Sequence, residues 1–368
     1  MDLAQRRWPP RPGDDEIALL AEVARSGIWT DGYWTAEVER RMARVTGAPH
    51  AVAFNSCTSA IHAALHAMGC TAASRVAAPA LTFAGTVTGA AHIRADLAFA
   101  DVLPDTLTLD PDSAADSAAD LVIAVDLHGV PHRLGRDRHA GAPVLTDACQ
   151  SIGGRLEGRH IGGTGTHAWS FSSAKLVCAP DGGAVTTDDD AVAGRLRELR
   201  DYGVPAGESR SNGAVAHPGG HNWRPSELTM AMVAHRLERL DDLAARAGAV
   251  AKHFHAALDE LGLWRQAAGE HAEPAWHKIR FGFPGWDPER CAEAERALAE
   301  AGVPTHRWGL RPLHHHPAFR GPGTPDLPVA ETAAAGTLCL GTEQNPPAAW
   351  TDDEVARVCH LLETITGS

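Results

Sequence analysis

Residues 51–68 read AVAFNSCTSAIHAALHAM: a short apolar run, a cluster of small hydroxyl residues, then small apolar residues at helical spacing. The run predicts a buried strand, and the rest predicts a helix that begins at the hydroxyl cluster. Strands separated by helices in this way indicate a mostly parallel sheet covered on both faces. Six similar runs follow along the chain: RVAAP (75–79), DLAFADV (96–102), DLVIAVD (120–126), PVLTD (143–147), HAWSF (167–171) and GAVTT (183–187).

The length of the chain indicates more than one structural unit. It has 368 residues, and single hydrophobic cores stop growing at about 250 to 300 residues. We therefore expect a large α/β domain over residues 1–245, with an N-terminal helical segment, and a smaller C-terminal α/β domain over residues 246–368. Apolar residues at helical spacing over 226–258 predict a long helical stretch that bridges the two.

The composition excludes several classes of protein. A formal net charge of −13, from 33 basic and 46 acidic side chains, would repel a nucleic-acid backbone. No segment approaches the roughly 18 to 20 apolar residues of a membrane span, and the N-terminus lacks an apolar signal core. We therefore expect a cytoplasmic protein. The seven cysteines form no CxxC pair and are interpreted as reduced thiols.

The hydroxyl cluster between the first strand and its helix is a candidate anion site. Residues 55–60 read NSCTSA, and small hydroxyl residues at a helix N-terminus add O–H donors to its free backbone N–H groups. Such a site suits a phosphate group. An ordinary N-cap by serine or threonine explains the same residues when the segment is taken alone.

Two charged residues follow later strands, at the end of a parallel sheet where ligands collect. Asp147, in VLTDACQ (144–150), could pair with a pyridinium nitrogen, although caps and turns also use aspartate there. Lys175, in SFSSAK (170–175), precedes the flexible pair Gly182–Gly183. Its neighbours are apolar, tiny or hydroxyl-bearing, so desolvation favours the neutral amine that a Schiff base requires.

The order and spacing of these segments resemble the DegT/StrS family of pyridoxal-phosphate-dependent sugar aminotransferases. This resemblance implies an α/β protein of fold type I, with a mostly parallel seven-stranded sheet in the large domain, and a pyridoxal 5'-phosphate cofactor. The matching motifs, in the same order, are GIWTDGYW (27–34), NSCTSAIHAAL (55–65), PALTFAGT (79–86), FADVLPDTLTLD (99–110), TDACQSIGG (146–154), SFSSAK (170–175) with DGG (181–183), RDYG (200–203) and HNWRPSE (221–227).

The resemblance also implies roles for single residues. Lys175 would bond covalently to the cofactor and move protons, and Asp147 would pair with the pyridine nitrogen. Gln150 would contact the phenolic oxygen of the ring. Phe83 would stack on the ring, with a core phenylalanine at a strand end as the alternative. The phosphate would be held by the backbone at Cys57 and by the side chains of Thr58, Ser59 and Ser170.

The implied assembly is a homodimer whose active sites are shared between subunits. Asn222, in HNWRPSE, resembles a family residue that reaches the phosphate of the neighbouring subunit's cofactor. An aromatic turn between helices could line the substrate pocket, together with the segment around Pro312-Leu313-His314. The candidate substrate residues are Trp29, Tyr33, His128, Trp308 and His314.

Several segments depart from the family pattern. Residues 126–129 read DLHG where the family often has His-x-aromatic-Gly, and residues 180–183 read PDGG in place of Gly-Glu-Gly-Gly. The segment before His314 lacks the usual tyrosine, which leaves Trp308 and Arg311 as candidates to replace it. Relatives that remove a hydroxyl carry histidine at the lysine position, so Lys175 favours transamination.

The three consecutive histidines at 314–316 invite a metal hypothesis. Adjacent side chains point in different directions, however, and no cysteine or acidic residue accompanies them at ligand spacing. We therefore expect no metal site.

Taken together, these features predict transfer of an amino group from an amino acid, L-glutamate or L-glutamine, to a keto group of a sugar, nucleotide-linked sugar or cyclitol. A composition rich in Ala, Arg and Gly suggests a high-GC source and a pathway to a specialised metabolite such as an antibiotic. Two alternatives keep the cofactor. One is an elimination or cyclisation enzyme of the same fold, and the other is a non-catalytic regulator that binds pyridoxal phosphate.

Overall fold

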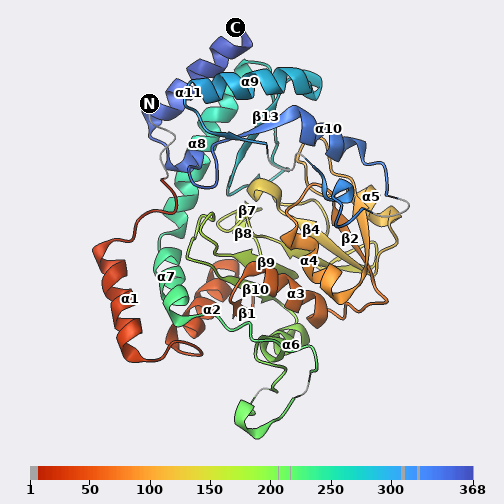
Figure 1. Ribbon diagram of the computed structural model, residues 1–368, viewed down its shortest axis with the longest axis vertical. Helices are drawn as coiled ribbons and strands as arrows, with labels where there is room; N and C mark the ends of the chain where they lie inside the picture. Colours follow the sequence, from red (N-terminus) through yellow and green to blue (C-terminus); the bar gives the residue numbers. More distant parts are fainter. Residues whose placement is uncertain (1–6, 206, 216, 308–310, 321–323, 368) are drawn as a thin grey trace.

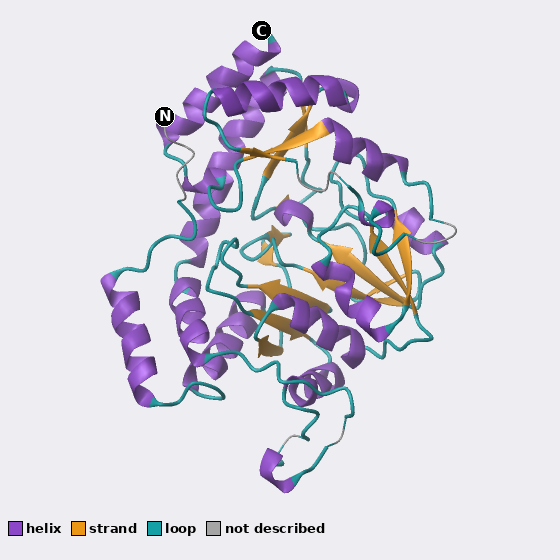
Figure 2. Cartoon of the chain, viewed as in Figure 1, coloured by secondary structure: helices purple, strands orange, loops and turns teal. Residues whose placement is uncertain are grey.

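The computed structural model describes residues 7–205, 207–215, 217–307, 311–320 and 324–367. A large sheet lies among helices, and a smaller, helix-covered sheet lies beside it near the C-terminus (Figures 1 and 2). The main strands of the large sheet are β1 (His50–Phe54), β2 (Arg75–Pro79), β3 (Asp96–Ala100), β4 (Leu121–Val125), β6 (Ala142–Asp147), β9 (Thr166–Ser170) and β10 (Gly183–Thr187).

The strand arrangement agrees with the sequence-based prediction. The path across the sheet is β1-β10-β9-β6-β4-β2-β3, with β5 (Arg138–His139) added as a short hairpin on β6. Neighbours from β9 to β3 pair in parallel, and β10 runs antiparallel to both β9 and β1. Each expected strand is present within two residues of its expected ends. The mostly parallel seven-stranded sheet is therefore confirmed.

Helices cover both faces of the large sheet, which explains why its strands are continuous apolar runs. Along β1, Val52 and Phe54 enter one core and Ala51 and Ala53 enter the other, because successive side chains of a strand alternate. The covering helices are α3 (Cys57–Ala67), α4 (Gly85–Ile93) and α6 (Asp190–Arg200) on the first face, and α2 (Tyr33–Thr46) and α7 (Glu227–Leu237) on the second.

The long helical stretch predicted over 226–258 is divided into two helices. The helix α7 ends at Leu237 and α8 (Leu240–Glu260) begins after Arg239, whose backbone lies at φ −104° and ψ 13°. Leu237 and Leu240 are both buried, so the chain turns between two packed side chains. This turn lets α7 pack on α2 while α8 packs on the smaller sheet. Because the apolar spacing continues across the turn, the sequence pattern did not indicate the break between the two helices.

The C-terminal unit is built on an antiparallel sheet in the order β11-β13-β15-β14. Its core includes Phe254 of α8 together with Phe281, Leu338 and Trp350. The boundary predicted between residues 245 and 246 falls within α8 and stays a prediction. The elements of this unit are β11 (Trp264–Arg265), β13 (Ile279–Gly282), α9 (Pro288–Glu300), β14 (Thr305–His306), α10 (Pro328–Gly336), β15 (Thr337–Leu340) and α11 (Asp352–Thr366).

A short three-stranded ribbon, in the order β12-β7-β8, joins the C-terminal half of the chain to the large unit. No helix within the described ranges has both the length and the apolar composition that crossing a membrane requires. The remaining elements are α1 (Asp14–Ser26), α5 (Pro111–Asp116), β7 (Arg155–Leu156), β8 (Arg159–His160) and β12 (Ala272–Glu273).

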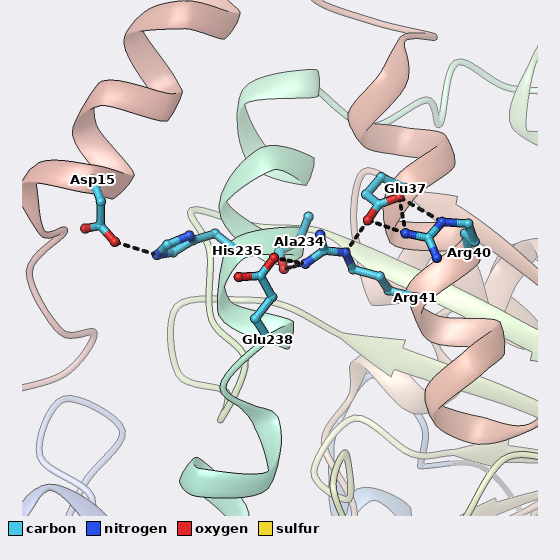
Figure 3. A network of polar contacts seen from close by, with 7 residues as sticks. All are labelled: Asp15, Glu37, Arg40, Arg41, Ala234, His235 and Glu238. Carbon is cyan, nitrogen blue, oxygen red and sulfur yellow. Dashed lines mark hydrogen bonds and ion pairs between the residues drawn. The ribbon is translucent and has the colours of Figure 1, made fainter.

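A polar network fastens the two N-terminal helices to α7 (Figure 3). Arg41 on α2 binds Glu37 on its own helix and reaches Glu238, just beyond α7, at 2.7 Å. Asp15 on α1 lies 3.4 Å from His235 on α7. These contacts therefore hold α1, α2 and the turn between them against α7.

Candidate active site

A cavity of about 250 Å³ opens where β6 and β9 end. The sheet brings the predicted lining residues together, because they end or follow a strand or lie at the start of the helix after it. Seven of the residues predicted to hold the cofactor line this cavity: Cys57, Thr58, Phe83, Asp147, Gln150, Ser170 and Lys175.

Lys175 lies in the turn after β9, and its backbone is held at both ends. Its N–H donates to the Ser172 carbonyl at 2.9 Å, and its carbonyl accepts from Trp8 Nε1 at 3.2 Å. Trp8 is buried, so the N-terminal segment braces the turn from outside. The side chain of Lys175 is left to line the cavity. The role of Trp8 had no signal in the sequence.

Asp147 ends β6 with its carboxylate buried, at 5% exposure. One carboxylate oxygen accepts from Thr86 Oγ1 at 2.7 Å, and the other accepts from the Cys149 N–H at 3.2 Å. Thr82 Oγ1 lies 2.8 Å from Thr86 Oγ1 and extends this chain of hydroxyl groups. Thr82 and Thr86 were missed as site residues, although both belong to the PALTFAGT motif.

The hydroxyl cluster both caps the helix α3 and lines the cavity. Ser56 is the N-cap of α3, because its hydroxyl accepts from the Ser59 N–H at 3.1 Å. Ser56, Cys57 and Thr58 all line the cavity, at the positive end of the helix. Ser59 does not line the cavity, and its hydroxyl lies 2.9 Å from that of Ser56.

Gln150 and His128 act as a pair. The His128 N–H donates to Gln150 Oε1 at 2.7 Å, which directs the donor end of the amide elsewhere. The ring of His128 is fully buried, and its Nδ1 lies 2.8 Å from Gln266 Oε1. Burial, reinforced by the charge of Arg280, holds the pKa of His128 well below its usual value. His128 is therefore a neutral group behind Gln150 and does not line the cavity.

Phe83 lies at the cavity with 68% of its surface exposed, so the alternative of a core phenylalanine does not fit. Gly85 keeps the space beside it open. A Cβ on Gly85 would lie 3.0 Å from Phe83 Cδ1 and 3.3 Å from Thr58 Oγ1. Glycine thus preserves room between an exposed aromatic ring and the start of α3.

The aromatic turn and Asn222 lie outside the cavity. Glu227 closes the turn, since its N–H donates to the Trp29 carbonyl at 2.9 Å and its carboxylate accepts from the Trp34 N–H at 2.7 Å. Trp29 and Tyr33 are consequently displayed at 61% and 66% exposure. Asn222 is also exposed, in a backbone bridge to Asp201.

His314, which was expected at the substrate pocket, does not line the cavity either. Trp308 lies outside the described residues. His314 is fully buried, with Nε2 2.9 Å from Glu331 Oε1, and His315 Nε2 lies 3.2 Å from the same oxygen. The expectation that no acidic residue accompanies these histidines is therefore wrong, because α10 brings Glu331 from 16 or 17 positions away.

Further lining residues were not predicted. Glu343 comes from the C-terminal unit and closes the cavity from that side, and Asp181 comes from the PDGG segment. Cys149 lies between two predicted residues, Asp147 and Gln150, and was passed over as a small apolar neighbour. Adjacency to Asp147 was its only signal.

These residues fit pyridoxal phosphate. Asp147 is a buried carboxylate that forms no ion pair within the described part of the chain, as suits a ligand with a positively charged ring nitrogen. The start of α3 provides an anion site, and Phe83 with Gly85 provides an open aromatic wall. Lys175 completes a site that joins an amine, the buried carboxylate of Asp147 and a phosphate cradle.

A family model supports this reading of the site. The model described as the DegT/DnrJ/EryC1/StrS aminotransferase family matches residues 10–363.

Solved structures share the fold. DesV of S. venezuelae, crystallised in complex with a ketimine intermediate, is 28% identical with a TM-score of 0.87, over 96% of this chain and 95% of that chain. The sugar aminotransferase CalS13 of Micromonospora echinospora is 24% identical with a TM-score of 0.86, over 96% and 98%. The 3-amino-5-hydroxybenzoic acid synthase is 24% identical with a TM-score of 0.87, over 98% of both chains. Fold type I is thereby confirmed.

Proposed function

The chain belongs to the DegT/DnrJ/EryC1/StrS aminotransferase family, and from this premise we propose that it moves an amino group from L-glutamate or L-glutamine to a keto group of a sugar, nucleotide-linked sugar or cyclitol. It is a pyridoxal-phosphate-dependent aminotransferase. The observation that carries the proposal is the meeting of Lys175, Asp147 and Thr58 at one cavity.

Lys175 is the residue that moves the proton. Bound pyridoxal phosphate draws electrons from the amine-bearing carbon of the substrate. With the cofactor bound, Lys175 would be the residue that holds it, and its Nζ would be the group that takes a proton from that carbon and returns it. The backbone bonds to Ser172 and Trp8 limit where the amine can go.

Asp147 keeps the ring nitrogen charged. Its carboxylate is fixed by Thr86 Oγ1 and the Cys149 N–H, so little reorganisation is needed when the ring nitrogen arrives. Gln150 would offer the donor end of its amide to the phenolic oxygen of a bound cofactor, because its Oε1 is already taken by the His128 N–H. His128 acts through Gln150 and is a positioning residue.

The phosphate is held at the start of α3. The backbone at Cys57 and the hydroxyl of Thr58 supply donors there, and Ser170 adds a hydroxyl from the end of β9. Ser59 supports this arrangement indirectly, by completing the cap with Ser56.

A second copy of the chain completes the site. Asn222 is exposed and lies outside the cavity of its own chain, and the segment between α6 and Asn222 projects from the large unit (Figure 1). In a homodimer, Asn222 reaches the phosphate of the partner's cofactor. The exposed Trp29 and Tyr33 then become part of the neighbouring pocket.

The acceptor belongs to specialised metabolism. Membership of the aminotransferase family, together with the fold shared with the sugar aminotransferase CalS13, supports a keto-sugar-like acceptor. Trp29, Tyr33, Trp308 and His314 are the residues proposed to shape its pocket. His314 would do so through Glu331 and the surrounding segment, since its own ring is buried.

The test separates this function from elimination and from cofactor binding without turnover. Purified protein loaded with pyridoxal phosphate is given each amino acid in turn, while the cofactor spectrum and released keto acid are followed. Transamination converts the cofactor to its amine form with one keto acid per site, and a keto-sugar panel then restores the starting spectrum. Continuous release of keto acid and ammonia without an acceptor would indicate elimination. A spectrum unchanged by any donor would indicate a regulator.

A further inference from the structure

Two thiols meet in the cofactor cavity. Cys57 Sγ and Cys149 Sγ lie 3.0 Å apart although the residues are 92 positions apart in the sequence. Cys57 is the first residue of α3, and Cys149 lies in the turn after β6. Both line the cavity beside Asp147 and Lys175. The transamination mechanism uses neither thiol.

The separation is short enough for a covalent bond. A disulfide has an S–S length of about 2.05 Å, so the sulfurs need to approach by about 1 Å. Both cysteines are free thiols in this structure. The backbone segments that carry them are packed in the same core, so rotation of the two side chains supplies most of the movement.

We propose that Cys57 and Cys149 are a redox modification site, at which a low-molecular-weight disulfide converts the two thiols into an intramolecular disulfide that cofactor in the cavity prevents from forming. One protein thiolate attacks a sulfur of the small disulfide and releases one thiol. The second protein thiol then attacks the mixed disulfide and releases the other. Two protein thiols are oxidised and one small disulfide is reduced to two thiols.

The charges around the pair determine its reactivity. The hydrogen bond with Cys57, burial and the carboxylate of Asp147 raise the pKa of Cys149, and the amine of Lys175 opposes this. Asp181 and Glu343 line the same cavity and add negative charge. Exchange is therefore slow near neutral pH and accelerates as the pH rises, because the thiolate is the attacking species.

A small disulfide reaches the two thiols through the cavity, so cofactor bound there protects them from exchange. Cys57 is 7% exposed, and both cysteines line the cavity that pyridoxal phosphate would fill. At a cofactor concentration of about 100 times Kd, the fraction of open sites falls about a hundredfold. The protection rests on the proposed function, whereas the disulfide itself does not.

The full chain, freed of cofactor, is treated with bis(2-hydroxyethyl) disulfide in the presence of a chelator, and intact mass and peptide maps are recorded. The expected product has lost two hydrogens, links the Cys57 and Cys149 peptides, and is reversed by dithiothreitol. Added pyridoxal phosphate should slow its formation at least tenfold. Cys149→Ser should give no such link and a mixed adduct at Cys57, while Cys359→Ser, a buried control on α11, should behave like the unaltered chain.

Mixed adducts on both cysteines without a link, or no reaction at either, would overturn the modification site. An unchanged rate with added cofactor would overturn the protection. Failure of the proposed function has a different signature. The reduced protein loaded with pyridoxal phosphate would then release keto acid and ammonia continuously, or keep an unchanged spectrum with every amino donor, whatever the peptide maps contain.

Discussion

The cofactor end of the cavity and the expected substrate side are built differently. At the cofactor end, Asp147 is fixed by two hydrogen bonds and Gln150 by one. On the substrate side, Trp29 and Tyr33 are 61% and 66% exposed and do not reach the cavity of their own chain. One chain thus preorganises the residues at the cofactor end, whereas in the proposed homodimer recognition of the acceptor would depend on surfaces that a second copy covers.

We expect the largest effect on kcat from a substitution of Lys175, at the cofactor end of the cavity. Lys175→Ala removes the amine that bonds the cofactor and moves the proton, so kcat should fall by about 10³-fold or more. The absorbance of covalently bound cofactor should disappear. Lys252→Ala, on the exposed face of α8, is the matched control and should change neither. An intact absorbance band in the Lys175 variant would contradict the assignment.

Asp147→Asn keeps the shape of the side chain but removes its charge. We expect kcat to fall about 10²-fold, with a much smaller change in the Kd of the cofactor, because the phosphate contacts remain. Thr86→Val should lower kcat about tenfold, the equivalent of one hydrogen bond to a charged group. Steady-state kinetics and cofactor titration measure both. Equal losses of rate and affinity in the Asp147 variant would argue against the ring-nitrogen role.

The shared site should be visible by complementation. Asn222→Ala is expected to weaken cofactor binding about tenfold, the loss of a hydrogen bond to a phosphate. Co-expression with Lys175→Ala gives mixed dimers in which one site has Lys175 from one chain and Asn222 from the other. At a cofactor concentration below the Kd of the Asn222 variant, activity should rise above the sum of the separate variants. If it does not rise, or if the protein runs as a monomer in light scattering, the dimeric site is wrong.

The smallest effect on chemistry is expected in the C-terminal unit. Arg7 lies 2.6 Å from Glu354, and this hydrogen bond is the largest of the causes that lower the pKa of Glu354 from 4.5 to about 2. Glu354→Gln should lower the free energy of unfolding by about 2 kcal/mol at neutral pH and leave kcat within about twofold.

The effect of Glu354→Gln on the free energy of unfolding should depend on pH. A pKa lowered by folding stabilises the protein above the unfolded value of 4.5, and the stabilisation is lost as the pH falls towards 2. The difference between Glu354→Gln and the unaltered chain in urea unfolding should therefore shrink between about pH 7 and about pH 3. Glu363→Gln, in an exposed pair with His360, is the control and should cost little at either pH. A difference that persists unchanged in acid would contradict this account.

Much of the fold was predictable because the signals are local. The seven strands, and the places where Lys175 and Asp147 follow them, were read from apolar runs of about five residues. The histidine run shows the limit of such reading. Its spacing suggested no acidic neighbour, yet Glu331 lies 2.9 Å from His314 in space.

The sequence by itself determined the succession of strands along the chain. It also pointed to the amine, the carboxylate and the phosphate cradle, since each depends on side chains close together along the chain. The tertiary structure alone decided which distant groups hold them. Thr86 reaches Asp147 from 61 positions away, the backbone N–H of His128 holds Gln150, and Cys57 meets Cys149. These contacts come from the pairing of parallel strands, which brings remote carboxyl ends to one edge, and no local periodicity encodes that pairing.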